Sequence, residues 1–285
     1  MLRGKMREID VAIIKDAVAE LCVKANLELR RDVVKALKAA LKKETAPRAR
    51  DILKLILENA RLARAKGLAI CQDTGIATVF LEIGQDCGLA GGYLKDAVNE
   101  GVRIGYRRGC LRSSVVDDAI LRKNTKDNTP AILHIDIVKG DRVRIVVTPK
   151  GFGSENKSAI EMFRPTEDPE AIKAFILDTV TKAGPDACPP FVVGIGIGGT
   201  FEEAAILSKK ALIRPIDERN PKRHLAKLEK ELLAGINSLK IGPMGLGGKT
   251  TALGVNILDY PTHITGLPVA VSISCHATRS AERLL

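Results

Sequence analysis

The chain has 285 residues, and its composition of 45% hydrophobic and 28% charged residues excludes a disordered protein. No apolar run reaches the roughly 18–20 residues that span a membrane, and the N-terminus lacks the apolar core of a secretory signal, so we expect a cytoplasmic protein. The net charge of +11 is typical of nucleic-acid binding, but aromatic residues make up only 3% of the chain. An anionic small substrate or an acidic partner subunit fits the charge as well, and we expect neither nucleic acid nor a membrane as a partner.

The first part of the chain is predicted to be helical. Val11, Ile14, Val18 and Leu21 recur at helical spacing, and Cys22 joins their apolar face, where we expect it to pack in the core. Two further helices are predicted at residues 32–43 and 47–66.

Strands and helices alternate in the rest of the chain. Strands are predicted at residues 68–71, 77–83, 131–138, 142–148, 191–195 and 269–274. Helices are predicted at residues 94–106, 169–183, 200–212 and 225–239. Residues 139–141 give a hairpin signal, and Gly-rich loops are predicted at residues 151–156 and 242–248. With no repeat, linker or boundary, we expect one α/β domain over residues 1–285, with mixed β-sheets flanked by helices and a helical N-terminal segment over about residues 1–66.

Two Gly-rich motifs match nucleotide-binding loops only in part. Residues 194–199 (GIGIGG) follow a strand and open a helix, as in dinucleotide-binding proteins. Residues 214–221 form a turn, however, where that motif needs a second strand ending in an acidic residue. Residues 247–250 (GGKT) resemble the end of a phosphate loop, but Pro243 stands where the motif requires Gly. For the first motif, tight packing or a helix N-terminus near another anion is the favoured interpretation.

Six cysteines in a cytoplasmic chain are expected to be free, metal-bound or catalytic rather than paired in disulfides. Three of them lie where a strand meets a loop, the kind of position at which functional side chains converge: Cys71, Cys188 and Cys275. Their wide separation matches neither zinc-finger nor ferredoxin spacing, so spacing alone leaves core packing open as an explanation. The surroundings of Cys87 and Cys110 are ordinary.

Five segments carry a more specific signal because they occur in one order: CQDTG (71–75), KGFGSEN (150–156), GIGIGGT (194–200), GLGGKTTA (245–252) and LPVAVSISCH (267–276). Together they resemble the alpha subunit of class I fumarate hydratase, a pattern that the L-tartrate dehydratase alpha subunit shares, over nearly the whole chain. The resemblance implies a hydro-lyase for a small dicarboxylic acid, with an oxygen-sensitive [4Fe–4S] cluster on Cys71, Cys188 and Cys275. It also implies that the fourth iron has no protein ligand and acts as a Lewis acid on the substrate hydroxyl.

The same resemblance implies roles for five further residues. Asp73 would protonate the leaving hydroxyl, while its alternative role is to cap a loop. Gln72 and Arg112 would bind substrate carboxylates, the latter through the two-pronged guanidinium, although Arg112 alone could be a surface charge. His263 would contact the substrate, although a lone His is more often structural, and Gly153 would permit close approach of the backbone.

The general base of the family belongs to a second polypeptide region, and we find none of its motifs in residues 1–285. We therefore expect a beta subunit that completes the active site, in a dimer of alpha–beta units. Dehydration of (S)-malate to fumarate is the favoured activity, and dehydration of L-tartrate to oxaloacetate is the alternative. A non-catalytic iron–sulfur redox-sensing subunit is a rival of another class. The set Asp73, Arg112 and His263 argues against it, because a sensor needs no carboxylate clamp.

Overall fold

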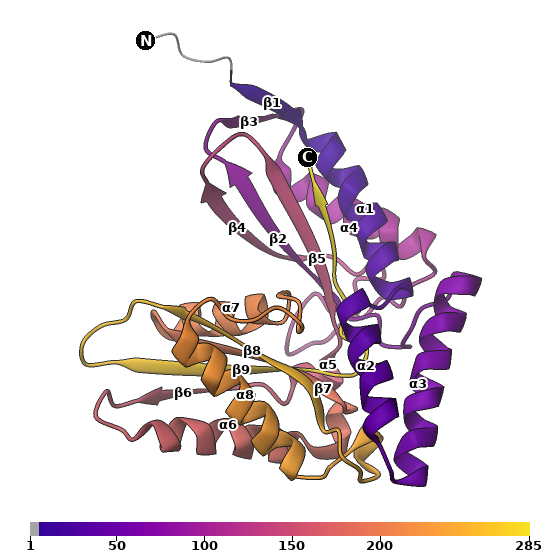
Figure 1. The fold of residues 1–285 in the computed structure, drawn as a ribbon. Coiled ribbons are helices and arrows are strands. Elements are labelled where there is room, and N and C mark those ends of the chain that lie inside the picture. Colours follow the sequence, from indigo (N-terminus) through magenta and orange to yellow (C-terminus); the bar gives the residue numbers. More distant parts are fainter. Residues whose placement is uncertain (1–5) are drawn as a thin grey trace. The chain divides into compact units, whose positions relative to one another are not determined.

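The computed structural model describes residues 6–285, which divide into two compact units whose segments alternate along the chain (Figure 1). Unit 1 contains residues 6–29, 60–151 and 279–285, and unit 2 contains residues 30–59 and 152–278. Because each unit is assembled from separate segments, no single linker lies between them. This explains why the sequence shows no domain boundary.

Unit 1 is built on a four-stranded mixed sheet in the order β10–β5–β2–β4. Its strands are β2 (Ile76–Gly84), β4 (Ile132–Val138), β5 (Val143–Lys150) and β10 (Ala281–Leu284). Strand β2 is parallel to β4 and antiparallel to β5, and β10 is antiparallel to β5. Helices α1 (Val11–Leu27) and α4 (Leu94–Arg108) pack on each other and cover one face of the sheet (Figure 1). A short parallel pair, β1 (Arg7–Asp10) and β3 (Cys87–Ala90), completes the unit.

The core of unit 1 lies between this sheet and its two helices. Alternate residues of β2, such as Val79 and Leu81, are fully buried. On α4, Gly105 lets α1 approach closely, since an added Cβ would lie 2.6 Å from the Ala19 carbonyl oxygen. Cys22 is fully buried here, and burial raises the pKa of its thiol to about 12. The prediction that Cys22 packs in the core is confirmed.

Two local predictions for unit 1 are wrong. Residues 139–141 connect β4 to β5, but the two strands do not form a hairpin, because β2 lies between them and pairs with both. The connection crosses the end of β2, where a Cβ on Gly84 would be 2.3 Å from the Gly140 carbonyl oxygen. Residues 68–71 form no strand, since the Ile70 N–H bonds to the Asn26 carbonyl oxygen at the end of α1 rather than to a sheet.

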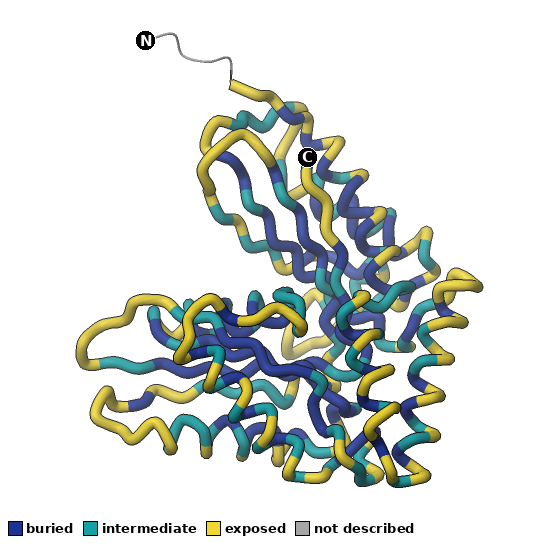
Figure 2. Tube along the Cα trace, viewed as in Figure 1, coloured by how far each residue is buried: buried dark blue, intermediate teal, exposed yellow. Residues whose placement is uncertain are grey.

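Unit 2 is built on a second four-stranded mixed sheet, in the order β6–β9–β7–β8. Its strands are β6 (Ala159–Phe163), β7 (Phe191–Gly198), β8 (Ala252–Tyr260) and β9 (Leu267–Ser274). Strand β7 is parallel to β8 and antiparallel to β9, and both β7 and β9 are almost entirely buried (Figure 2). Helices α6 (Pro169–Ala183) and α8 (Arg223–Ser238) pack on one face, and α7 (Phe201–Ala211) packs on the other (Figure 1).

The helical N-terminal segment is confirmed, because α1 is followed by α2 (Arg31–Lys43) and α3 (Pro47–Lys66). Residues 1–5 of that segment lie outside the described residues. Short helices occupy parts of the predicted loops: α5 (Phe152–Glu155), η1 (Gly184–Ala187) and η2 (Pro243–Gly245). The fold class is confirmed as α/β with mixed sheets flanked by helices. Within residues 6–285, no helix combines the length and the apolar character that crossing a membrane requires.

Candidate active site

The loop Cys71–Gly75 of unit 1 is tied to the segment that carries Arg112. The Thr74 hydroxyl accepts the Arg112 backbone N–H at 3.0 Å and donates to the Arg112 carbonyl oxygen at 3.1 Å. The buried Tyr106 hydroxyl lies 2.9 Å from the Thr74 carbonyl oxygen and 3.0 Å from that of Gly75. Burial raises the pKa of Tyr106, so the phenol remains a hydrogen-bond donor. The segment with Cys71, Gln72 and Asp73 and the segment with Arg112 are thus neighbours in unit 1.

Asp73 caps its own loop. Its Oδ1 accepts the Gly75 N–H at 3.0 Å, which is the local role that the sequence left open. Its Oδ2 lies against Gly151, where an added Cβ would be 3.1 Å away. The carboxylate therefore meets the Gly-rich segment that follows β5, and capping uses only part of its hydrogen-bonding capacity.

Cys188 and Cys275 lie on neighbouring loops of unit 2. Cys188 follows η1 with a left-handed backbone (φ +54°), and Cys275 directly follows β9. The His276 backbone N–H donates to the Cys188 carbonyl oxygen at 3.1 Å. Because Val192 of β7 pairs with Ser274 of β9, both cysteines lie at the same end of the sheet. Both side chains are partly exposed.

Gly153 lies in the same part of unit 2. It is in α5, and an added Cβ would lie 3.7 Å from the carbonyl oxygen of Asp186, in the turn before Cys188. Lys157, just after α5, pairs with the Asp186 carboxylate at 3.2 Å. Gly153, Cys188 and Cys275 therefore gather at one end of the unit 2 sheet.

His263 does not join this group. It lies on the exposed loop between β8 and β9, with its Nδ1 2.8 Å from the Thr265 hydroxyl. Cys275 follows the other end of β9, and the eight residues of that strand span about 25 Å. A small dicarboxylate held next to Cys275 cannot reach His263 over that distance. The structure thus separates one predicted substrate ligand from the two cysteines of unit 2.

The glycines of the dinucleotide-like motif serve helix packing. Gly194 and Gly196 lie inside β7 rather than in a loop after it. A Cβ on Gly194 would be 2.2 Å from the Ser208 carbonyl oxygen, and one on Gly196 would be 2.0 Å from that of Ala204. Helix α7 can therefore lie directly on the strand, which supports the packing interpretation.

The second Gly-rich motif binds an internal carboxylate. The Lys249 N–H donates to Oε2 of Glu44 at 2.6 Å, and an added Cβ on Gly248 would be 2.7 Å from the same oxygen. Phosphate loops use such N–H groups for phosphate oxygens. Here the position next to Lys249 is taken by the side chain of Glu44.

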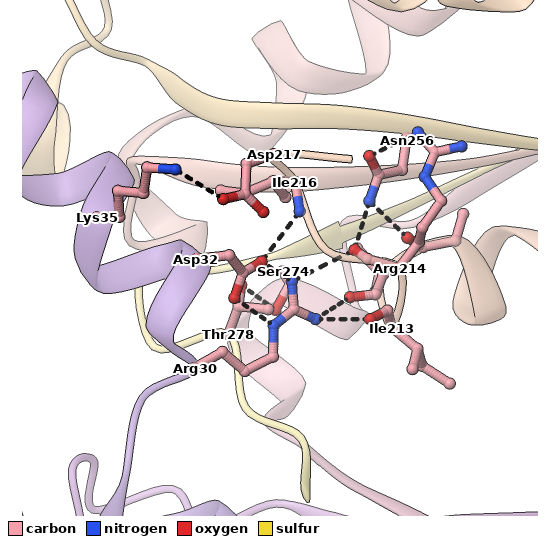
Figure 3. A network of polar contacts seen from close by, with 12 residues as sticks. Arg30, Asp32, Lys35, Ile213, Arg214, Ile216, Asp217, Asn256, Ser274 and Thr278 are labelled. Atoms are coloured by element: carbon pink, nitrogen blue, oxygen red, sulfur yellow. Dashed lines mark hydrogen bonds and ion pairs between the residues drawn. The ribbon is translucent and has the colours of Figure 1, made fainter. Parts of the chain in front are cut away.

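A polar network connects α2 to the segment after α7 in unit 2 (Figure 3). Arg30 donates to the carbonyl oxygen of Leu212 at 2.6 Å and pairs with Asp32. Asp32 also accepts the Ile216 N–H at 3.0 Å, and Asp217 pairs with Lys35 at 3.0 Å. Asp217, an acidic residue of the turn at positions 214–221, is thus engaged in holding α2, which is a structural role.

The donor chemistry of the chain suits a cluster bound by thiolates. None of the six cysteines, all within the described residues, is in a disulfide, and Cys71, Cys188 and Cys275 are partly exposed on loops. Cys22 is buried with a raised thiol pKa, which disfavours the thiolate that a metal needs. Cys71 belongs to unit 1 and the other two to unit 2. Within residues 6–285, no three His, Cys, Asp or Glu side chains form a ready metal-binding group.

Sequence reasoning missed the residues that support the loop Cys71–Gly75. They are remote in sequence, and their burial shows only in the fold: Asn26, Tyr106, Asn128 and Arg279. Arg279 lies four positions after Cys275, but this proximity indicates neither its burial nor its partners.

Comparison with known proteins gives the family. The sequence model of the family "Fumarate hydratase (Fumerase)" matches residues 15–283. The L(+)-tartrate dehydratase subunit alpha of Escherichia coli (strain K12) is 32% identical over 289 residues, covering 100% of this chain and 95% of that protein. A protein of Methanocaldococcus jannaschii, named provisionally as the same kind of subunit, is 44% identical over 275 residues, covering 94% of this chain and 96% of its own length. The chain belongs to the fumarate hydratase family of hydro-lyases, and the resemblance found in the sequence is confirmed.

Proposed function

We propose that the chain is the alpha subunit of an iron–sulfur hydro-lyase that dehydrates a hydroxylated four-carbon dicarboxylic acid. The observation that carries the proposal is the loop Cys71–Gly75, where a partly exposed thiol, a carboxylate and a segment with a guanidinium are fixed together in unit 1. Family membership over residues 15–283 supports the same reaction class.

Cys71, Cys188 and Cys275 are the proposed ligands of a [4Fe–4S] cluster. Three thiolates would leave one iron without a protein ligand, and when bound the cluster supplies a Lewis acid for the departing hydroxyl. The contact between His276 and Cys188 supports the set, because it keeps two of the ligand loops together.

Asp73 is the proposed acid that protonates the departing hydroxyl, and Gln72 and Arg112 are the proposed ligands of substrate carboxylates. Oδ1 of Asp73 is held by the Gly75 N–H and its Oδ2 lies beside Gly151, so the carboxylate has a defined position. Thr74 fixes the backbone of Arg112, and a planar guanidinium matches a carboxylate with two parallel hydrogen bonds. Gly153 lies close enough to the Cys188 turn to allow backbone approach. His263 receives no role next to the cysteines of unit 2.

Two substrates remain candidates, each supported by a different observation. The description of the matching family favours the interconversion of (S)-malate and fumarate. The names of the relatives favour dehydration of L-tartrate to oxaloacetate. Because the relatives are named as alpha subunits, we also propose a beta subunit as the partner.

The cluster is tested by anaerobic reconstitution of the chain with iron and sulfide. We expect about four irons and four sulfides per chain, and rapid loss in air. Replacing any one of the three proposed ligands by Ser should abolish cluster formation. Cys110→Ser is the matched control, since Cys110 is an exposed thiol outside the proposed set. A full cluster in a ligand variant would reject that ligand.

The reaction is tested with the reconstituted chain and its beta subunit, assayed with (S)-malate and L-tartrate in parallel. Turnover of either acid supports the hydro-lyase, and the ratio of the two kcat/KM values assigns the substrate. An intact cluster without turnover of either acid would favour the rival redox-sensing role.

A further inference from the structure

Arg279 is buried in unit 1, with only 6% of its surface exposed. Its Nη2 donates to the carbonyl oxygen of Asp73 at 2.8 Å, and its Nη1 donates to Oδ1 of Asn26 at 2.9 Å. The guanidinium therefore joins the backbone of the proposed acid to the end of helix α1. An arginine keeps its charge at any physiological pH, so burying it is costly unless its hydrogen bonds are needed.

The other end of the loop, at Ile70, is fixed to Asn26 as well. The Ile70 N–H donates to the backbone carbonyl oxygen of Asn26 at 2.9 Å. Asn26 is itself buried, and its Nδ2 donates to the Cys22 carbonyl oxygen one turn earlier in α1. The loop from Ile70 to Asp73 is thus attached at both ends to one frame, made of Asn26 and Arg279.

Gly151 shows how close the guanidinium comes to the acid. A Cβ added to Gly151 would lie 3.1 Å from Oδ2 of Asp73 and 3.6 Å from Nη2 of Arg279. The carboxylate and the guanidinium therefore border the same small space, which only a residue without a side chain leaves open. The Nε–H of Arg279 is buried and has no hydrogen-bond partner among the described residues, so the fold tolerates an imperfect site for this side chain.

We propose that Arg279 is a positioning residue that fixes the loop Ile70–Asp73, and with it the proposed cluster ligand Cys71 and the proposed acid Asp73. The catalytic role of the loop rests on the proposed function, whereas the hydrogen bonds by which Arg279 holds the loop do not. The geometry requires two donors on one planar group, one for Asn26 and one for Asp73. Lysine keeps the charge but lacks this fork.

The first experiment measures how strongly Arg279 holds the loop. Arg279→Gln, Arg279→Lys and the control Arg283→Gln are compared by amide hydrogen exchange of the chain, with the amides of β2 and β5 as internal reference. Arg283 is the matched control because it lies on β10 and pairs with Glu20 at the surface. We expect exchange of residues 70–75 to rise at least about tenfold in both Arg279 variants, with the reference unchanged. Exchange at the wild-type rate in residues 70–75 of the Arg279 variants would overturn the proposal. If Arg279→Gln does not fold, the result for Arg279→Lys decides.

The second experiment tests whether the hydrogen bonds of Arg279 affect cluster binding and turnover. Residues that orient a metal ligand typically affect metal binding or activity by about 10–100-fold. We expect Arg279→Gln to release iron to a chelator about 10–100-fold faster than wild type and to lower kcat similarly, with KM changed less than about threefold. In an Asp73→Asn background, Arg279→Gln should lower kcat by a smaller factor than in wild type, because the acid is absent and only the effect through Cys71 is left.

The outcomes separate the two proposals. If wild type forms no cluster and turns over neither acid, the proposed function fails. Hydrogen exchange still tests whether Arg279 holds the loop. If wild type is active and Arg279→Gln loosens the loop without changing iron release or kcat, the positioning role is overturned.

Discussion

Glu44 offers the clearest test of how unit 2 holds its loops. The side chain is buried, with 2% exposed, and follows the end of α2. Its Oε1 accepts the N–H groups of Thr45 at 2.8 Å and Ala46 at 3.0 Å, and its Oε2 accepts that of Lys249 at 2.6 Å. One carboxylate thus satisfies three backbone donors. It connects the start of α3 to the Gly-rich loop.

Glu44→Gln keeps the size of the side chain and replaces one acceptor by a donor. In either orientation the amide NH₂ faces at least one of the backbone N–H groups, so that at least one buried donor loses its partner. Hydrogen bonds to a charged group contribute about 1.5–3 kcal/mol each, and an unsatisfied buried group costs about 1–3 kcal/mol. We therefore expect the free energy of unfolding to fall by about 2–4 kcal/mol.

The measurement is urea unfolding at pH 7, with Glu170→Gln as the control. Glu170 is also in unit 2, but its carboxylate is 72% exposed and its partner Lys173 also pairs with Glu231, so its replacement should cost less than about 0.5 kcal/mol. A loss at Glu44 that is no larger than the loss at Glu170 would refute the reasoning.

The pH dependence gives an independent check. Burial raises the pKa of Glu44, but the N–H groups of Ala46, Lys249 and Thr45 outweigh it and hold the pKa below the usual 4.5. A carboxyl whose pKa is lowered by folding contributes stability that is complete above the unfolded pKa and is lost as pH falls through the folded value. The difference between wild type and Glu44→Gln should therefore be constant above about pH 5 and shrink below pH 4.5. A difference that grows on acidification would contradict the assignment.

Three further substitutions test the remaining assignments. Asp73→Asn should leave the cluster intact and lower kcat about 10²–10⁴-fold, and near-normal turnover would leave Asp73 only its capping role. Arg112→Lys should raise KM with the cluster spectrum unchanged, because the forked contact to a carboxylate is lost; unaltered kcat and KM would reject it as a ligand. Gly196→Ala should lower the free energy of unfolding by about 1–3 kcal/mol or more, since its Cβ would lie 2.0 Å from the Ala204 carbonyl oxygen. The control Gly266→Ala, with no atom within 4 Å of the added Cβ, should be nearly neutral.

Local patterns predicted the elements of this fold better than their pairing. Helices α1, α2 and α6 show apolar periodicity or clear ends, and all three lie where the sequence places them. The pairing of β4 with β2 could not be predicted, because the turn at residues 139–141 looks the same whether or not a third strand lies between its neighbours. The alternation of the two units along the chain is likewise a property of long-range contacts.

The candidate site likewise contains residues that local motifs predict and residues that only the fold reveals. The sequence indicated Cys71, Asp73 and Arg112 through short motifs, because such motifs record the chemistry that substrate and cofactor need. It did not indicate Glu44 or Arg279, whose roles depend on burial and on partners 205 and 206 residues away. The substrate role of His263 stays a prediction, since a motif can identify a residue without saying at which end of a strand it lies.

The last prediction concerns the partner subunit. A dehydration needs one group that protonates the departing hydroxyl and another that removes a carbon-bound proton. Asp73 is the proposed residue for the first task, and we find no residue for the second in the two groups of site residues, one around Arg112 and one around Cys188. Lack of a base typically costs about 10²–10⁴-fold, so the reconstituted chain alone should show the cluster spectrum with negligible turnover of malate or tartrate. Adding the beta subunit should restore turnover and slow the loss of iron in air. If the isolated chain turns over either acid at a substantial rate, the base must lie within this chain, and the proposed division of the site between two subunits is wrong.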